Sequence, residues 1–193
     1  MVIRSVLAGG RVKLPDAVYK FATGPERRRK LLAPFWAAGF FAVIVAVFAG
    51  GMLTDLILGL PRLLDGLAGV GIGIVLVGAG MVVYAWCVAV FLRAKGTPVP
   101  VNPPRELVQG GPYAVVRNPM LTGLFAVLFG LGFILHSMST VLVWMPLFIL
   151  LNAIWLRLVE EPELEKRLGV KYAEYRQRVP MFIPKWHRRS SAA

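Results

Sequence analysis

Residues that bind metals or form disulfides are scarce in this chain of 193 residues. Its one cysteine, Cys87, lies inside an apolar run, and its two histidines, His136 and His187, lie far apart. So few ligands exclude a disulfide framework and a zinc cluster of cysteine and histidine. We therefore expect no metal site of this kind, and any reaction must use other side chains.

Charged residues are also few, at 17% of the chain against about 25% in soluble domains. Acidic residues are the rarer kind, because 10 Asp and Glu stand against 22 Lys and Arg and leave a net charge of +12. Apolar residues make up 57%, which argues against a disordered chain and an ordinary cytosolic enzyme. Since nucleic-acid binding needs a basic face on a water-soluble fold, we expect anionic membrane lipids as partners and no nucleic acid.

Four apolar runs without charge predict membrane-spanning helices. They cover residues 35–54, 67–92, 120–135 and 141–156. The first holds 20 residues, which matches the roughly 20 that a helix needs to cross about 30 Å of hydrocarbon. The last two hold 16 residues each, and the polar residues 136–140 between them predict an antiparallel hairpin. The expected fold is all-α, an integral membrane bundle of about four transmembrane helices.

Several residues within or beside these runs lead to separate predictions. Gly69 and Gly73 are spaced so that another helix backbone can approach closely. Asp55, just after the first run, is interpreted as an interfacial residue, with a functional intramembrane carboxylate as the alternative. His136 and Ser137 are neighbours at a turn, where their side chains do not face one another, so they are not expected to form a catalytic pair.

The positive charges predict the orientation of the bundle. Lys and Arg number eight in residues 1–34, four in residues 93–119 and nine from residue 157 onward. The loop of residues 61–66 holds one, and residues 136–140 hold none. Because positively charged loops stay in the cytoplasm, both termini and the 93–119 loop are predicted to be cytoplasmic, in a cell (inner) membrane.

The chain is expected to have four parts. A basic N-terminal segment (1–34) precedes two spans (35–92), a region with a loop, a hairpin and a C-terminal helix (93–184), and a basic tail (185–193). The cluster of residues 27–30, Arg-Arg-Arg-Lys, is expected to hold the first helix at anionic headgroups. The tail is expected to be disordered.

Polar chemistry collects in two segments. The first is the loop of residues 97–119, called the linker below, whose prolines and glycines predict a shaped loop that offers backbone groups to a small polar ligand. The second starts where the last apolar run ends, with Arg157, Glu160 and Glu161. Arg157 and Glu161 stand four residues apart and can form an ordinary ion pair. Alternatively, the carboxylates bind hydroxyl or ammonium groups of a ligand and Arg157 binds its carboxylate.

An amphipathic helix is predicted after these carboxylates. Its apolar residues, Leu164, Leu168, Tyr172, Tyr175 and Val179, recur at steps of three and four, with basic residues between them. Such a helix lies on the bilayer surface or caps the bundle. We interpret its tyrosines as packing residues. The helix is expected to end at proline 180, and residues 181–184 are expected to fold back onto the bundle.

Taken together, the polar segments resemble a known enzyme family over residues 101–184. In order, the motifs are Gly111-Pro112-Tyr113, Arg117-Asn118-Pro119 with Gly123, Glu160-Glu161-Pro162-x-Leu164, and Gly169-x-x-Tyr172-x-x-Tyr175 with Val179-Pro180. This pattern resembles the C-terminal half of the isoprenylcysteine carboxyl methyltransferases, to which membrane enzymes that methylate phospholipid amines or small thiols are related.

The resemblance implies an S-adenosylmethionine-dependent methyltransferase with a lipophilic or membrane-associated acceptor. The cofactor is then expected between the linker and the last helices, bordered by Leu107, Val108, Tyr113, Arg117, Asn118, Pro119, Met120, Leu121, Glu160 and Glu161. Arg157 and Asn118 are the predicted catalytic residues, with Arg157 near the acceptor. Asn118 stands where these enzymes usually have histidine and Leu121 where they usually have tyrosine, so the acceptor can be a carboxylate, an amine or a thiol.

The scarcity of cysteine and histidine is compatible with this chemistry. Methyl transfer from a sulfonium needs alignment and a desolvated acceptor, but neither a metal nor a covalent nucleophile. Two other interpretations stay open: a non-enzymatic membrane bundle that binds anionic lipid or a partner protein, and a membrane reductase with a similar C-terminal half. The methyltransferase interpretation requires the linker and the acidic segment to meet in space around one ligand.

Overall fold

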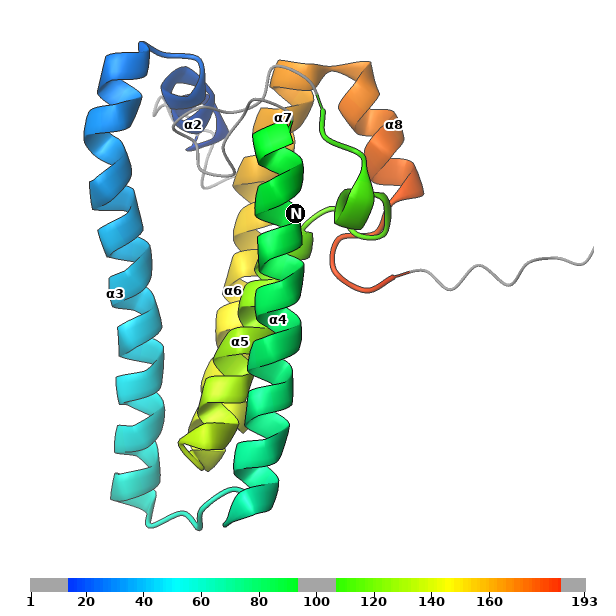
Figure 1. Ribbon diagram of the computed structural model, residues 1–193. Helices are drawn as coiled ribbons and strands as arrows, with labels where there is room; N and C mark the ends of the chain where they lie inside the picture. Colours follow the sequence, from blue (N-terminus) through cyan, green and yellow to red (C-terminus); the bar gives the residue numbers. More distant parts are fainter. Residues whose placement is uncertain (1–13, 94–106, 185–193) are drawn as a thin grey trace, which may run out of the picture.

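The computed structural model describes residues 14–93 and 107–184, and the regular elements in this part of the chain are all helices (Figure 1). The helices are α2 (Leu14–Ala22), α3 (Glu26–Leu58), α4 (Leu67–Arg93), α5 (Pro119–Ile134), α6 (Met145–Trp155), α7 (Glu161–Leu168) and α8 (Val170–Arg178). A 3₁₀ turn, η1 (Gly111–Ala114), and two π-helical segments, η2 (Thr140–Trp144) and η3 (Leu156–Glu160), complete them. The all-α prediction is confirmed for these residues, whereas the basic tail and the first half of the linker lie outside them.

In the described part of the chain, three helices are long and apolar enough to cross a membrane: Glu26–Leu58, Leu67–Arg93 and Thr140–Leu168. The fourth predicted span is the shorter apolar helix α5, whose 16 residues reach only about 24 Å at 1.5 Å per residue. The chain is therefore a membrane protein, and its described residues hold three full-length candidate spans and one shorter apolar helix.

Helix α4 packs closely along α5 because glycines face each other at two levels. A Cβ atom on Gly80 would lie 2.4 Å from the carbonyl oxygen of Gly123, and one on Gly73 would lie 2.6 Å from that of Gly130. The prediction of close backbone approach is thus confirmed at Gly73. Gly69 is equally tight, but its neighbours belong to the two loops at that end of the bundle.

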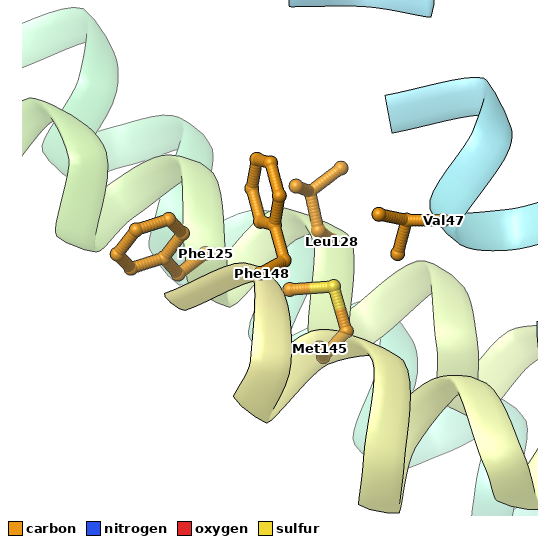
Figure 2. Close-up of a cluster of buried hydrophobic side chains, with 5 residues drawn as sticks. All are labelled: Val47, Phe125, Leu128, Met145 and Phe148. Atoms are coloured by element: carbon orange, nitrogen blue, oxygen red, sulfur yellow. The ribbon is translucent and has the colours of Figure 1, made fainter. Parts of the chain in front are cut away.

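The apolar core joins α3, α5 and α6. Figure 2 shows its buried side chains, Val47, Phe125, Leu128, Met145 and Phe148. The Phe125 and Phe148 rings meet edge to face, with centroids 6.0 Å apart. Most other large apolar side chains of α3 are exposed, as expected for a helix that faces lipid.

Asp55 anchors the hairpin turn to the end of α3. Its Oδ1 accepts a hydrogen bond from the backbone N–H of Ser139 at 2.8 Å, and its Oδ2 accepts one from the Ser137 hydroxyl. The His136 Nδ1 atom instead lies 2.9 Å from the carbonyl oxygen of Leu64. Asp55 therefore binds one backbone N–H group, that of Ser139, at the start of the last long helix, as an N-cap carboxylate does.

One helix continues from Thr140 to Leu168 through two prolines. Proline lacks an N–H group and clashes with the carbonyl group four residues before it. The π-helical segment η2 precedes Pro146 and η3 precedes Pro162, and the wider π turn relieves this conflict. The helix thus runs beyond its apolar part and carries Arg157, Glu160 and Glu161 to the end of the bundle.

The predicted amphipathic helix is divided between α7 and α8. The break lies at Gly169, whose φ of 62° lies in the left-handed region that favours glycine. The segment after α8, residues 179–184, is called the C-terminal segment below. Its Phe182 ring packs 5.7 Å from the Phe125 ring, which confirms that this segment folds back onto the bundle.

Helix α2 lies against α7 at the same end of the bundle (Figure 1). Lys166 Nζ lies 2.7 Å from Asp16 Oδ1 and 5.0 Å from the centre of the Tyr19 ring. The N-terminal segment is thus in contact with the helix that carries the acidic residues.

Candidate functional site

The linker and the acidic start of α7 meet through a buried ion pair. Arg117 Nη2 lies 2.6 Å from Glu161 Oε1, and these side chains are only 10% and 7% exposed. The second oxygen of Glu161 lies 3.9 Å from Arg176 Nη1. Within the described residues, Glu161 thus pairs with Arg117 and Arg176, whereas no ion pair joins it to Arg157.

An open pocket of about 480 Å³ surrounds this ion pair. Its lining comprises Arg117, Arg157, Glu161, Arg176, Val179, Pro180 and Met181. The volume lies within the range of small-molecule sites. Three guanidinium groups and one carboxylate suit a ligand that carries an anionic group beside a cationic one.

Backbone hydrogen bonds hold the end of the linker beside the C-terminal segment. The N–H of Arg117 donates to the carbonyl oxygen of Pro180 at 2.8 Å, and the N–H of Asn118 donates to that of Met181 at 3.1 Å. These bonds hold Arg117 beside Pro180 and Met181, and all three residues line the pocket.

Three buried tyrosines pack beside this wall. Tyr175 donates its hydroxyl hydrogen to the carbonyl oxygen of Tyr113 at 2.7 Å, and the Tyr113 ring meets the Phe91 ring edge to face. Burial raises the pKa of Tyr175 to about 12 and also raises the pKa of Tyr113 and Tyr172. All three are therefore neutral at physiological pH, so they can pack in an apolar environment and donate hydrogen bonds.

The predicted site residues fall into two groups. Arg117, Arg157 and Glu161 line the pocket. The others surround it or lie further away: Leu107 and Val108 at the start of the described linker, Tyr113 in η1, Asn118 before α5, Pro119, Met120 and Leu121 in its first turn, and Glu160 at the end of η3. Leu121 packs against the apolar core.

Four lining residues were not among the predicted site residues: Arg176 and residues 179–181. The sequence marks Arg176 only as one charge of an amphipathic helix. Pro180 marks the end of a helix in the sequence. The expectation that the chain folds back after this helix end was the signal that could have placed residues 179–181 beside the linker.

A family model for phospholipid methyltransferases matches residues 68–171, which is more than half of the chain. The chain belongs to the phospholipid methyltransferase family. This family is related to the isoprenylcysteine carboxyl methyltransferases, so the sequence resemblance is confirmed. No curated protein and no solved structure matches the chain.

Membership decides between the interpretations that the sequence left open. The enzymes of the phospholipid methyltransferase family depend on S-adenosylmethionine, and so does this chain. The matched region begins in α4 and ends in the first turn of α8. It therefore includes Arg117, Arg157 and Glu161, while Arg176 lies beyond it.

The charges of the pocket fit S-adenosylmethionine, the cofactor of this family. S-adenosylmethionine carries a sulfonium, an ammonium group, a carboxylate and ribose hydroxyls. Glu161 is a buried carboxylate, which is the kind of group that complements the positive charges, and guanidinium groups, of which the pocket holds three, complement a carboxylate.

Proposed function

We propose that this enzyme transfers a methyl group from S-adenosylmethionine to the amine of a phospholipid headgroup, at the cytoplasmic face of a cell membrane. The observation that carries the proposal is the contact between Arg117 and Glu161, because it brings the linker and the acidic segment to one pocket. Family membership supports a phospholipid acceptor. Among common headgroup atoms, an amine nitrogen is the strongest nucleophile.

The proposed cofactor site has Glu161 at its centre, with Glu160 beside it. Leu107, Val108, Tyr113, Arg117, Asn118, Pro119, Met120 and Leu121 border the cofactor in this proposal. These residues are proposed because they lie close to Arg117 in the chain. Arg117 itself contacts Glu161.

Arg157 is proposed to bind the phosphate of the acceptor, with Asn118 nearby as the second catalytic residue. Arg157 lines the pocket, and its side chain makes no ion pair within the described residues. Guanidinium groups bind phosphate oxygens through two parallel hydrogen bonds. Arg157 thus remains available for an anionic headgroup.

The reaction needs alignment and the exclusion of water from the protein. When bound, S-adenosylmethionine supplies an electrophilic methyl group on its sulfonium sulfur. The headgroup amine must first lose a proton to water or to a carboxylate, and its nitrogen then bonds to the methyl carbon as the carbon–sulfur bond breaks. The protein residues hold the two reactants in line and replace their hydration shells.

The distribution of positive charge supports the cytoplasmic face. The connection between α3 and α4, residues 59–66, lies at the end of the bundle opposite α7 (Figure 1), and Arg62 is its one Lys or Arg. Under the positive-inside rule this distribution supports a cytoplasmic pocket, and the proposal includes cytoplasmic termini. The cluster of residues 27–30 is proposed to bind anionic headgroups at the same interface.

Sealed vesicles of both orientations test acceptor and face together. Labelled S-adenosylmethionine is added outside, lipids are extracted, and the labelled product is separated by headgroup and by stability to base. We expect a labelled lipid only in vesicles with the cytoplasmic face outward, and we expect base to leave its methyl label on the headgroup nitrogen. Release of the label as methanol in base would indicate a methyl ester, and a labelled product that stays in the aqueous phase of the lipid extraction would exclude a phospholipid acceptor.

Glu161→Gln tests the proposed cofactor site in the same assay. Loss of the charge is expected to reduce S-adenosylhomocysteine binding by about 10- to 100-fold, as charged hydrogen bonds contribute about 1.5–3 kcal/mol. Glu174→Gln is the matched control, because Glu174 is an exposed carboxylate on α8. Equal binding by both variants in calorimetry would contradict the role of Glu161.

A further inference from the structure

We infer that Arg117 is a positioning residue, which fixes Glu161 against the end of α8, rather than a direct ligand of the cofactor. This inference rests on the proposed role of Glu161 in cofactor binding. Both terminal nitrogens of Arg117 already have protein partners: Nη2 lies 2.6 Å from Glu161 Oε1, and Nη1 donates to the carbonyl oxygen of Arg176 at 2.8 Å. Each contact uses one hydrogen of its terminal nitrogen, and together the two contacts fix the orientation of the guanidinium group before any ligand binds.

The second contact satisfies a carbonyl group that the helix cannot satisfy. In a continuing α-helix, the carbonyl oxygen of Arg176 would accept a hydrogen bond from the N–H of residue 180. Residue 180 is proline, which has no N–H. Arg117 supplies the missing donor and places its positive charge at the negative end of α8.

The first contact decides which way Glu161 points. A carboxylate with a side chain 7% exposed needs a partner, because a buried charge without one is costly. Arg157 stands four residues earlier on the same helix, at the spacing that allows an ion pair. With Arg117 in place, Glu161 faces the linker and leaves Arg157 unpaired within the described residues. Arg117 thereby keeps both the carboxylate and the free guanidinium available to ligands.

The substitution Arg117→Lys separates the positioning role of residue 117 from its positive charge. An ammonium group keeps the charge, but it lacks the planar fork that reaches two acceptors at once. Arg117→Lys is therefore expected to reach either Glu161 or the Arg176 carbonyl, and to leave the other without its partner.

A double-mutant cycle tests the inference on full-length protein purified in detergent. Arg117→Lys, Glu161→Gln and the double variant are compared by calorimetry with S-adenosylhomocysteine and by KM for S-adenosylmethionine and for lipid. We expect Arg117→Lys to weaken S-adenosylhomocysteine binding at least about fivefold in the wild-type background but less than about twofold in the Glu161→Gln background. KM for S-adenosylmethionine should rise in parallel, whereas a loss of folded protein would lower kcat alone.

The controls separate this inference from the proposed function. Lys171→Ala removes an exposed cation from α8 and should bind S-adenosylhomocysteine as the wild type does. An equal effect of Arg117→Lys in both backgrounds, or no effect in the wild type, would overturn the positioning role alone. Wild-type affinity in Glu161→Gln would instead remove the proposed role of Glu161, on which the inference depends.

Discussion

Tyr175 holds the linker against α8 with one buried hydroxyl group. The residue is 3% exposed, and its hydroxyl donates to the carbonyl oxygen of Tyr113 at 2.7 Å. A tyrosinate has no hydrogen to donate, so this bond exists only in the neutral form. Burial raises the pKa of Tyr175 to about 12, which keeps the donor in place at physiological pH.

The stability of the protein should therefore fall at alkaline pH. Between about pH 10 and 12 the unfolded chain loses the Tyr175 proton while the folded chain keeps it, so unfolding becomes easier as pH rises, by up to about 3 kcal/mol. Tyr175→Phe should remove about 1.4 kcal/mol per pH unit from this decline. Thermal unfolding in detergent from pH 8 to 12 measures both curves, and an unchanged slope in Tyr175→Phe would contradict the assignment.

The sequence predicted individual pocket residues better than it predicted their ion-pair partners. Glu161, Arg117 and Arg157 follow from the motifs, and all three line the pocket. The partner of Glu161 does not follow, because spacing along a helix shows only neighbours three or four residues away. Arg117 belongs to another segment and reaches Glu161 only through the fold.

At the scale of elements, glycines determine how α4 and α5 approach. Gly80 and Gly123 touch across the two helices, whereas a Cβ atom on Gly78 would meet no atom within 4 Å. These two glycines of α4 therefore have opposite roles, although both lie inside one apolar helix.

Alanine substitutions distinguish these roles. Gly80→Ala would place a methyl group 2.4 Å from a backbone oxygen, and overpacking of this kind typically costs about 1–3 kcal/mol. Gly78→Ala should instead be neutral or stabilise by up to about 1 kcal/mol, since alanine favours helix. Unfolding of both variants in detergent measures the difference, and equal stabilities would show that the two helices do not pack through Gly80.

Hydropathy predicted the apolar runs but not the ends of the helices. Helix α3 begins at Glu26, before the apolar run that starts at residue 35, and the last long helix continues to Leu168 instead of ending near residue 156. Hydropathy reports where hydrocarbon surrounds a helix. It does not report where charged turns extend the helix into water.

At the scale of the whole molecule, the two ends of the bundle differ in chemistry. One end holds the pocket, α2 and nearly all described cations, and the other is closed by Asp55 and the hairpin turn (Figure 1). The sequence indicated this asymmetry through the positions of its Lys and Arg residues. The side of the membrane that the pocket faces is part of the proposed function.

Photochemical cross-linking of labelled S-adenosylmethionine, followed by peptide mapping, tests most directly whether one ligand touches both polar segments. The account predicts labelled peptides from residues 107–121 and from residues 157–165, with labelling reduced in Glu161→Gln and retained in Glu174→Gln. Labelling confined to one of these segments, or located near Asp55 at the opposite end, would contradict a cofactor site between the linker and α7.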